Sequence, residues 1–332
     1  MSADLALDLG SASARLWHRD GPVVDEPNLA AVDLDSGRLV AFGAAAQTMG
    51  AGAAGRIRVV RPVRRGQIAD IGLGDQVLAA LLRRAGVHRL AKARVLVGLH
   101  LDATSVQRRS LERALDEAGA RTVRFVELPI GVALGAGLAI EEPAGTMVIE
   151  VGAAVSDIAV LALGGIVTSA SLPLGGGDLE DAVRSVLARH HGLLVDRATA
   201  AEVLAMIGTL EPIAVDERVE VLGREISSGR MATAILQRSD VRAVLGETLS
   251  PLYDAAVRCI AQAPPDLAND LLGTGIVLAG GTSVLEGLAH RLAGATGLSV
   301  RVAPDPRRCA VGGVARCVDL LDLEELQPTR RR

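Results

Sequence analysis

The chain has 332 residues, a formal net charge of −4 and 49% hydrophobic residues, of which few are aromatic. This length is sufficient for two domains with separate cores, which must be built mostly from aliphatic side chains. The slightly acidic balance gives no electrostatic footprint for nucleic acid, so nucleic-acid binding is not expected.

Cysteine usage and hydropathy predict a cytoplasmic protein. The three cysteines include no C-x-x-C pair, which favours a reducing compartment and no zinc motif. The N-terminus shows neither the basic nor the apolar region of a signal peptide. The most apolar window, 146–167, contains Glu150 and Asp157 and alternates in polarity, so we expect sheet there rather than a membrane span.

Strands and helices are expected to alternate along the chain. Strands or hairpins are predicted over residues 4–17, 95–101, 122–126 and 145–173. Helices, marked by apolar residues at helical spacing, are predicted over residues 74–85, 104–119, 130–138, 179–192, 250–263 and 309–323. Thr104 with Gln107 forms a capping-box pattern, and glycines at 119, 192 and 297 are typical helix stops. This alternation indicates an α/β fold.

Two segments of the chain echo each other. Residues 6–14 and 148–156 each run from apolar residues to an acid, an apolar residue, a glycine and a string of small residues. We expect each to be a hairpin whose turn lets backbone approach a ligand. The acids, Asp8 and Glu150, could hold a cation through water, and the small turns could present N–H groups to phosphate. Two copies suggest a duplicated domain.

A third segment has the composition of a nucleotide-binding turn. Residues 275–283 read as a buried strand that enters a Gly-Gly turn, and a helix follows. A glycine-rich turn that opens a helix presents free N–H groups to an anion or a nucleotide. We therefore expect Gly280, Gly281, Thr282 and Ser283 to contact a ligand.

The order of these segments resembles that of the first phosphate loop, second phosphate loop and adenosine loop of the actin-like ATPase superfamily. Within it the chain is similar to the MreB family, bacterial actins that organise cell-wall synthesis. Residues 61–70 resemble the family's "RPxxxGxIAD" stretch, and residues 94–120 its "RVLV … ATxVERR … GAGA" run. Residues 195–208 and 305–313 resemble its "xxATAExIKxEIG" and "DPxxCVAxGxG" segments, so the resemblance covers nearly the whole chain.

The resemblance implies an α/β, actin-like fold of two duplicated, ribonuclease H-like domains with two smaller insertion subdomains and an interdomain nucleotide cleft. The first domain would span residues 1–140, with a small insertion at about 22–60. The second would span residues 141–306, with an insertion at about 178–250. Residues 307–332 would form a C-terminal helix that returns to the first domain, and a tail.

The resemblance also implies ATP or ADP with Mg²⁺ as the cofactor. Asp8 and Glu150 would hold the metal through water. The expected nucleotide-binding residues are Asp8, Gly10, Ser11, Ala12, Ser13, Glu150, Gly152, Ala153, Ala154, Glu202, Gly280, Gly281, Thr282 and Ser283.

The second phosphate loop departs from the family pattern. Ala153 and Ala154 replace two glycines, and a methyl group there could obstruct a phosphate. Val155 replaces the family threonine, and Ser156 is the nearest hydroxyl that could substitute for it.

The hydrolytic and ribose contacts also depart from the pattern. The family's water-positioning glutamate corresponds to Leu128 here, and Glu127 is one residue early, on the opposite face of an extended segment. The ribose-contacting Lys and Glu correspond to Leu204 and Met206, which leaves Glu202 as the only nearby acid. Two interpretations stay open: nucleotide binding is kept but weak, or the loops are now only turns. Efficient hydrolysis is not expected.

The predicted function is a cytoskeletal filament subunit or scaffold in cell-shape determination and wall assembly. The expected partners are the chain itself, a second MreB and wall-synthesis proteins. Membrane contact would be at most peripheral, at the inner face, because the loop at 86–92 is not strongly apolar. The alternatives are a non-polymerising regulator of MreB filaments and a small-molecule or sugar kinase on the same fold.

Overall fold

The computed structural model describes residues 4–18, 20–50, 55–64, 67–87, 93–212 and 215–320, without the side chains of 50 and 318–320. The chain forms two compact units. Unit 1 comprises residues 1–143, 163–166 and 307–332, and unit 2 comprises residues 144–162 and 167–306. Each unit is built on a five-stranded sheet.

The main sheet of unit 1 has the strand order β10-β9-β1-β2-β3. Its strands are β1 (Asp4–Leu9), β2 (Ser13–His18), β3 (Gly21–Pro27), β9 (Ala93–Leu99) and β10 (Ala120–Glu127). The first two strands form the hairpin expected from the sequence, and β1 pairs in parallel with β9. The turn at residues 10–12 therefore follows the carboxyl end of a central strand.

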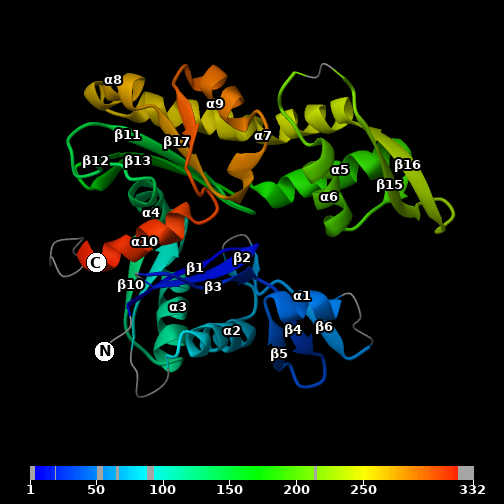
Figure 1. Ribbon diagram of the computed structural model, residues 1–332, viewed down its shortest axis with the longest axis horizontal. Helices are drawn as coiled ribbons and strands as arrows, with labels where there is room; N and C mark the ends of the chain where they lie inside the picture. The colour runs from blue at the N-terminus through cyan, green and yellow to red at the C-terminus, as the bar shows by residue number, and fades with distance from the viewer. Residues whose placement is uncertain are drawn as a thin grey trace. The chain divides into compact units, whose positions relative to one another are not determined.

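Helices cover both faces of this sheet (Figure 1). Leu5 and Leu7 pack with α2 (Ile71–Arg84) and α3 (Ser105–Glu117) on one face. Ala6 packs with α10 (Cys309–Leu320) on the other. Because side chains alternate along a strand, Asp8 lies on the α10 face.

Close packing of α10 on α4 (Leu128–Gly135) depends on glycine. A Cβ added at Gly135 would overlap the carbonyl of Cys309, and one at Gly313 would overlap the carbonyl of Gly131. The Cys309 thiol also donates a hydrogen bond to the Val132 carbonyl. The C-terminal helix is thus an integral part of unit 1.

A small sheet of order β5-β4-β6 extends unit 1. It contains β4 (Ala30–Asp33), β5 (Leu39–Phe42) and β6 (Ile57–Val60), with α1 (Ala44–Gly50) beside it; β7 (Val63–Arg64) and β8 (Gln67–Ile68) form a separate ribbon. The insertion expected at about 22–60 therefore starts later, because residues 21–27 pair with β2 in the main sheet.

The main sheet of unit 2 has the order β13-β12-β11-β17-β18. Its strands are β11 (Thr146–Val151), β12 (Ser156–Ala162), β13 (Gly165–Leu172), β17 (Ile276–Ala279) and β18 (Val300–Val302). Strands β11 and β12 are buried along their whole length, so they carry apolar side chains on both faces. The expected second hairpin is confirmed, and β17 pairs in parallel with β11.

Helices and a second small sheet complete unit 2. They are α5 (Gly176–His191), α6 (Arg197–Ile207), α7 (Arg238–Gln262), α8 (Pro265–Thr274), η1 (Gly281–Val284) and α9 (Leu288–Thr296), with β14 (Leu193–Leu194), β15 (Arg218–Glu225) and β16 (Met231–Gln237). The helix expected over 250–263 begins at Arg238. Buried Val241, Leu245 and Leu249 continue the core-facing stripe across Pro251, so packing overrides the local bias against helix before proline.

Local sequence signals at helix ends are confirmed. The Thr104 hydroxyl and the Gln107 side chain form the predicted capping box. Gly192 and Gly297 adopt the left-handed conformation that ends α5 and α9.

Within the described part of the chain, no helix combines the length and apolarity needed to cross a membrane. The loop at 86–92, whose weakly apolar sequence predicts at most peripheral membrane contact, lies mostly outside the described residues, because residues 88–92 are among those not described.

An ion pair closes the edge of the β1–β9 ladder and predicts a pH-dependent stability. Arg94 donates to both carboxylate oxygens of Asp4, at 2.6 and 2.8 Å. These hydrogen bonds hold the pKa of Asp4 below its usual 3.8. A lowered folded-state pKa stabilises the fold above the unfolded pKa, and this stabilisation is lost as pH falls through the folded pKa.

We expect Asp4→Asn to lower the free energy of unfolding by about 1 kcal/mol at pH 7. Urea unfolding between pH 2.5 and 7 should show the difference from wild type shrinking below pH 4. Asp35→Asn, which alters a carboxylate 67% exposed beside Arg56, is the matched control and should change stability much less. A difference that stays constant across this range would show that the ion pair is not its source.

Candidate functional site

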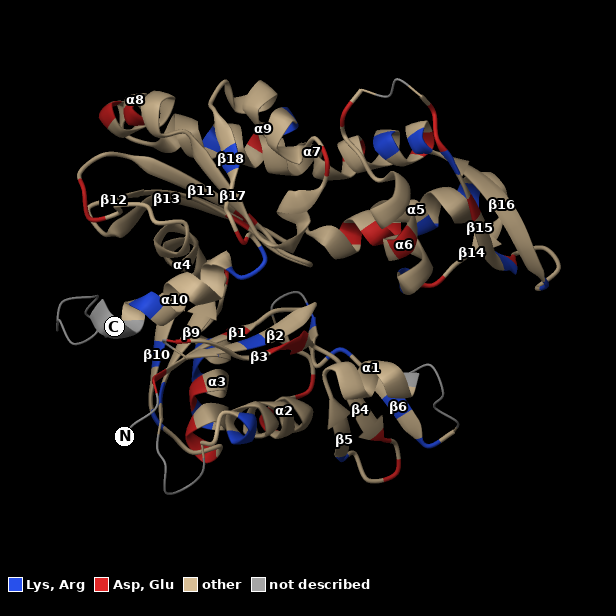
Figure 2. Cartoon of the chain, in the orientation of Figure 1, with Lys and Arg blue, Asp and Glu red and all other residues tan. Residues whose placement is uncertain are grey.

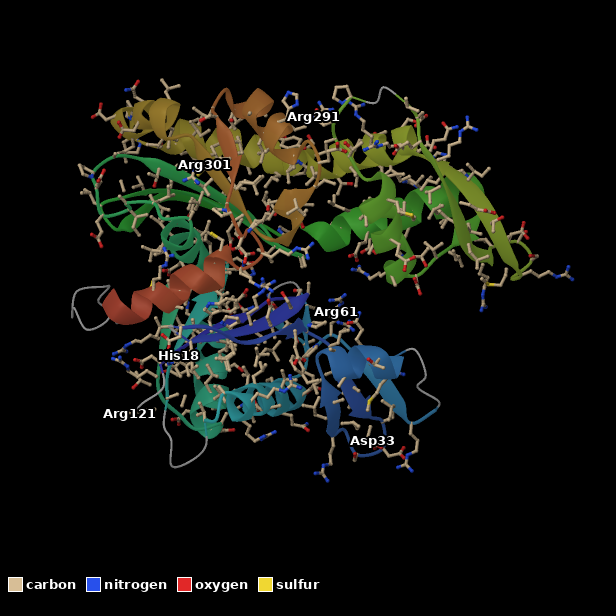
Figure 3. The ribbon with its side chains drawn as sticks, viewed as in Figure 1. His18, Asp33, Arg61, Arg121, Arg291 and Arg301 are labelled. Atoms are coloured by element: carbon tan, nitrogen blue, oxygen red, sulfur yellow. The ribbon has the colours of Figure 1, made fainter. Side chains whose placement is uncertain are left out.

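The first loop of the candidate site connects β1 to β2 and is held by groups outside it. The Gly10 N–H donates to the Ser13 carbonyl at 3.0 Å and closes the turn. Asn28 donates from its backbone to the Ala12 carbonyl at 2.9 Å and from its amide to the Gly10 carbonyl at 2.7 Å. Arg61, labelled in Figure 3, donates to the Ser11 carbonyl at 3.0 Å. The backbone of this loop is therefore tied at three carbonyls.

Asp8, the acid of this loop, already has a cationic partner within the protein. It is 8% exposed, and Arg15 donates to its Oδ2 at 3.0 Å. The same guanidinium donates to Asp25 at 3.2 Å, and Arg308 donates to Asp25 at 2.6 Å. Sequence reasoning missed Arg15, because only the register of the β1–β2 hairpin places it opposite Asp8.

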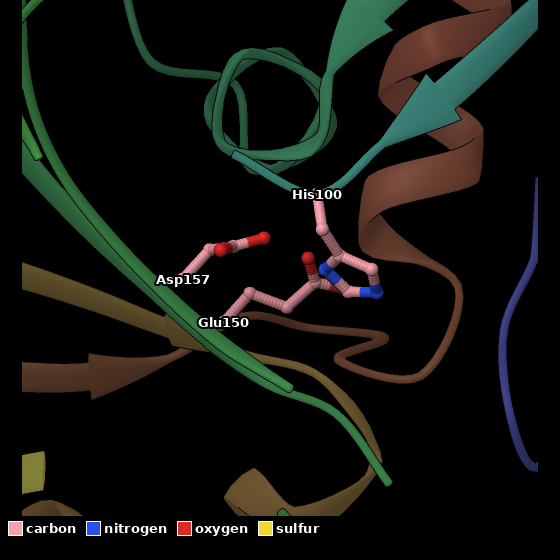
Figure 4. A group of neighbouring side chains, drawn as sticks. All are labelled: His100, Glu150 and Asp157. Atoms are coloured by element: carbon pink, nitrogen blue, oxygen red, sulfur yellow. The ribbon is translucent and has the colours of Figure 1, made fainter. Parts of the chain in front are cut away.

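The second loop connects β11 to β12 in unit 2. Its Gly152 N–H donates to the Val155 carbonyl at 3.0 Å, as Gly10 does in the first loop. Glu150 and Asp157 are register partners on these strands, and both are buried (Figure 4; His100, also drawn, belongs to unit 1). The Ser171 hydroxyl donates to Asp157 at 2.6 Å. Glu150 thus lies beside a second carboxylate, which the sequence pattern did not predict.

The second loop tolerates alanine because it does not use left-handed backbone. Leu163 is the only non-glycine residue with positive φ among those described, so Ala153 and Ala154 adopt ordinary conformations. The conformational reason for glycine at these two positions is therefore absent. Whether their methyl groups obstruct a phosphate stays a prediction.

Three glycines at the start of α5 belong to the same loop cluster. The Gly176 N–H donates to the Gly152 carbonyl at 3.0 Å, and the Gly177 N–H donates to the Ala153 carbonyl at 2.7 Å. A Cβ at Gly175 would lie 2.5 Å from backbone atoms of the second loop. Sequence reasoning did not single out residues 175–177, although a glycine run that opens a helix is a signal of this kind.

The adenosine-loop segment meets the second loop. The Thr282 hydroxyl donates to the Gly152 carbonyl at 2.8 Å, across 130 residues of sequence. Gly280 has a φ of +88°, and its Cα lies against the Val151 backbone. The buried Ser283 hydroxyl donates to the Gly280 carbonyl at 2.7 Å, so it braces the turn. Two expected segments of unit 2, the second loop and the adenosine-loop segment, therefore form one cluster with the unexpected glycines that open α5.

Other expected side chains have different environments. Glu202 lies on the exposed side of α6, and Met206 is 56% exposed. Val155 is buried. The prediction that the Ser156 hydroxyl could replace that of the family threonine is wrong. Ser156 is fully buried, and its hydroxyl donates to the Leu174 carbonyl at 2.7 Å.

The family's catalytic position is part of the core. Leu128 begins α4, is 2% exposed and packs on Gly98, where an added Cβ would lie 2.7 Å from its side chain. Glu127 ends β10, and Arg108 donates to its carboxylate at 3.3 Å. Leu128 has no group that can orient water, and the Glu127 carboxylate is already bound by an arginine.

Comparison with solved structures identifies the class of fold. The model superposes on MreB5 of Spiroplasma citri bound to AMPPNP with a TM-score of 0.91 and 28% identity, covering 98% of each chain. It superposes on a MamK double helical filament subunit with a TM-score of 0.82 and 18% identity, covering 96% of this chain and 99% of that one. The fold is therefore actin-like.

Sequence comparison gives the family. The model of the MreB/Mbl protein family matches residues 2–325. The cell shape-determining protein MreB of Escherichia coli K12 is 32% identical, covering 97% of this chain and 95% of the relative. The cell shape-determining protein Mbl of Bacillus subtilis 168 is 31% identical, covering 96% of both. The chain belongs to the MreB/Mbl family.

The Gly280 turn should be sensitive to a single methyl group. Gly280→Ala would place a Cβ in the Val151 carbonyl and impose a left-handed φ on alanine. We expect the free energy of unfolding, measured with urea, to fall by at least about 2 kcal/mol, because the variant combines backbone strain with a steric overlap. Gly281→Ala is the matched control, because nothing lies within 4 Å of its added Cβ and its φ is not left-handed. Equal effects of the two variants would contradict this account.

Proposed function

We propose that this chain is a cytoskeletal protein of cell-shape determination that assembles with copies of itself. The support is the family match over residues 2–325 and the cell-shape function in the names of relatives at 31–32% identity. A cytoplasmic location, at most peripheral membrane contact and wall-synthesis partners belong to the same proposal.

Nucleotide binding is the second part of the proposal. The observation that carries it is the backbone cluster of unit 2, in which the Gly152 carbonyl accepts from both Gly176 N–H and Thr282 hydroxyl. This cluster joins two glycine-rich turns and a helix N-terminus, which is a typical arrangement for phosphate. The MreB5 structures of Spiroplasma citri hold AMPPNP and ADP, and we extend adenine-nucleotide binding to this chain.

A nucleotide that binds the folded chain should stabilise it by mass action. At ten times its dissociation constant ATP should add about 1.4 kcal/mol, or roughly 2 °C in melting temperature for a chain of this size. We expect Asp8→Ala to reduce this shift, because the variant loses a carboxylate that fixes the Arg15 guanidinium beside the first loop. Asp35→Ala, an exposed acid of unit 1, should leave it unchanged. No shift in the wild type at millimolar ATP would contradict nucleotide binding.

Impaired hydrolysis is the third part of the proposal. Leu128 presents only hydrocarbon where the family has a water-positioning glutamate, and buried Val155 offers no hydroxyl. Assembly does not need those groups, so a chain that hydrolyses poorly can still polymerise. The alternative of a small-molecule or sugar kinase is disfavoured, because a kinase needs a base beside the acceptor hydroxyl.

Assembly and hydrolysis should therefore separate in one preparation. We expect sedimentation and negative-stain microscopy to show polymers or stable oligomers, with phosphate release at the background rate. Leu128→Glu combined with Val155→Thr should raise phosphate release, at a cost in stability because a carboxylate enters the core beside Gly98. Leu128→Met with Val155→Ile is the apolar control. Wild-type turnover well above background would contradict impaired hydrolysis, and a strictly monomeric chain would favour the regulator.

A further inference from the structure

Charged side chains form a ladder across three strands of unit 1, at the end that carries the first loop. Asp8 on β1 is opposite Arg15 on β2, and Arg15 is opposite Asp25 on β3. Directly opposite residues on antiparallel strands share a face, so all three side chains lie on the same face of the sheet. Figure 2 shows the basic and acidic residues of β2 and β3 beside one another on strands that are otherwise mostly uncharged.

The Arg15 guanidinium is fixed in place by both carboxylates. Its Nη1 donates to Asp8 at 3.0 Å and its Nε donates to Asp25 at 3.2 Å. Asp25 in turn accepts from Arg308 at 2.6 Å, just before α10 begins. Side chains of Arg15 and Asp8 are only 15% and 11% exposed. A planar group held at two edges and shielded from water keeps its orientation and its charge.

This arrangement conflicts with a water-bridged divalent cation at Asp8. Such a cation is attracted by an uncompensated carboxylate. Here a permanently charged guanidinium already compensates the Asp8 carboxylate, at hydrogen-bond distance. A metal ion beside Asp8 would meet the positive charge of Arg15 at close range, where little water screens it.

The first loop is contacted by a second arginine. Arg61 donates to the Ser11 carbonyl at 3.0 Å, so two guanidinium groups reach a loop that carries one carboxylate. Guanidinium is well suited to phosphate, because its fork of N–H donors matches two phosphate oxygens. The loop thus has protein-borne positive charge of the kind that a metal would otherwise supply.

We propose that Arg15 is a built-in cation that takes the place of the divalent metal beside Asp8, so that a nucleoside phosphate at the first loop meets this guanidinium rather than a divalent cation. This inference rests on the nucleotide binding proposed above. It assigns to Arg15 the neutralisation of Asp8 and an electrostatic contribution to phosphate binding.

Calorimetry with ATP tests the metal dependence. In wild type the dissociation constant in EDTA should lie within about 3-fold of that in millimolar Mg²⁺. Arg15→Leu removes the cationic partner of Asp8, so this variant should bind ATP at least about 10-fold more tightly with Mg²⁺ than in EDTA. Arg121→Leu, which removes an exposed arginine of β10, should behave as wild type. A wild type that loses ATP on chelation, or an Arg15→Leu variant without metal dependence, would overturn the proposal.

A metal titration without nucleotide tests independently whether Arg15 keeps a metal ion from Asp8. Free Mn²⁺, followed by its electron paramagnetic resonance signal, should bind Arg15→Leu at least about 5-fold more tightly than wild type. Adding Asp8→Asn to that variant should remove the gain. If neither wild type nor Arg15→Leu binds ATP but Arg15→Leu still binds Mn²⁺ more tightly, the proposed nucleotide binding is contradicted. The neutralisation of Asp8 by Arg15 then still stands. If the gain is absent, Arg15 is not what keeps metal from Asp8.

A milder substitution, Arg15→Gln, serves as the control for loss of the fold. Arg15→Gln keeps a hydrogen-bond donor and removes the charge, and circular dichroism with thermal unfolding checks that each variant is folded. Metal-dependent ATP binding and Mn²⁺ binding should appear in Arg15→Gln as in Arg15→Leu. A folded Arg15→Gln that behaves as wild type in both assays would reduce Arg15 to a structural residue.

Discussion

The candidate site of unit 2 depends on one carbonyl group. The oxygen of Gly152 accepts hydrogen bonds from the Gly176 N–H at 3.0 Å and from the Thr282 hydroxyl at 2.8 Å. These bonds join a hairpin turn, a helix start and a distant glycine turn, which are separated by up to 130 residues. Because the contacts are made mostly by backbone, this geometry does not require the side chains on which hydrolysis depends.

That distinction separates residues with a steric role from the positions to which the family resemblance assigns catalysis. Leu128 and Val155 are both about 2% exposed, so each apolar substitution adds to a core. Ala153 and Ala154 stand where no left-handed φ is needed. Glycine stands where geometry demands it: at Gly280 against Val151, and at Gly175 against the second loop. A larger side chain at either glycine would overlap backbone atoms, whereas the apolar side chains at 128 and 155 fit the core.

The sequence predicted those features that short-range patterns encode. The capping box at Thr104, the glycine stops at 192 and 297 and both hairpins follow from local chemistry, and the family resemblance supplied the fold. The helix predicted over 250–263 begins twelve residues earlier, at Arg238, because buried Val241 and Leu245 extend its core-facing stripe across Pro251. The glycine run at 175–177 is visible in the sequence, but its contact with the second loop and the burial of Ser156 depend on long-range contacts that no local pattern contains.

The charge state of the first loop is the feature that sequence reasoning was least able to see. The sequence pattern predicts Asp8 as the acid before a small-residue turn, whereas Arg15 lies in the following strand without any motif. Only pairing register turns two residues seven apart into opposite neighbours, and only Asp25 and Arg308 on further elements fix the guanidinium. A loop motif therefore specifies where a phosphate can approach, but the strands beside it determine which cation meets that phosphate.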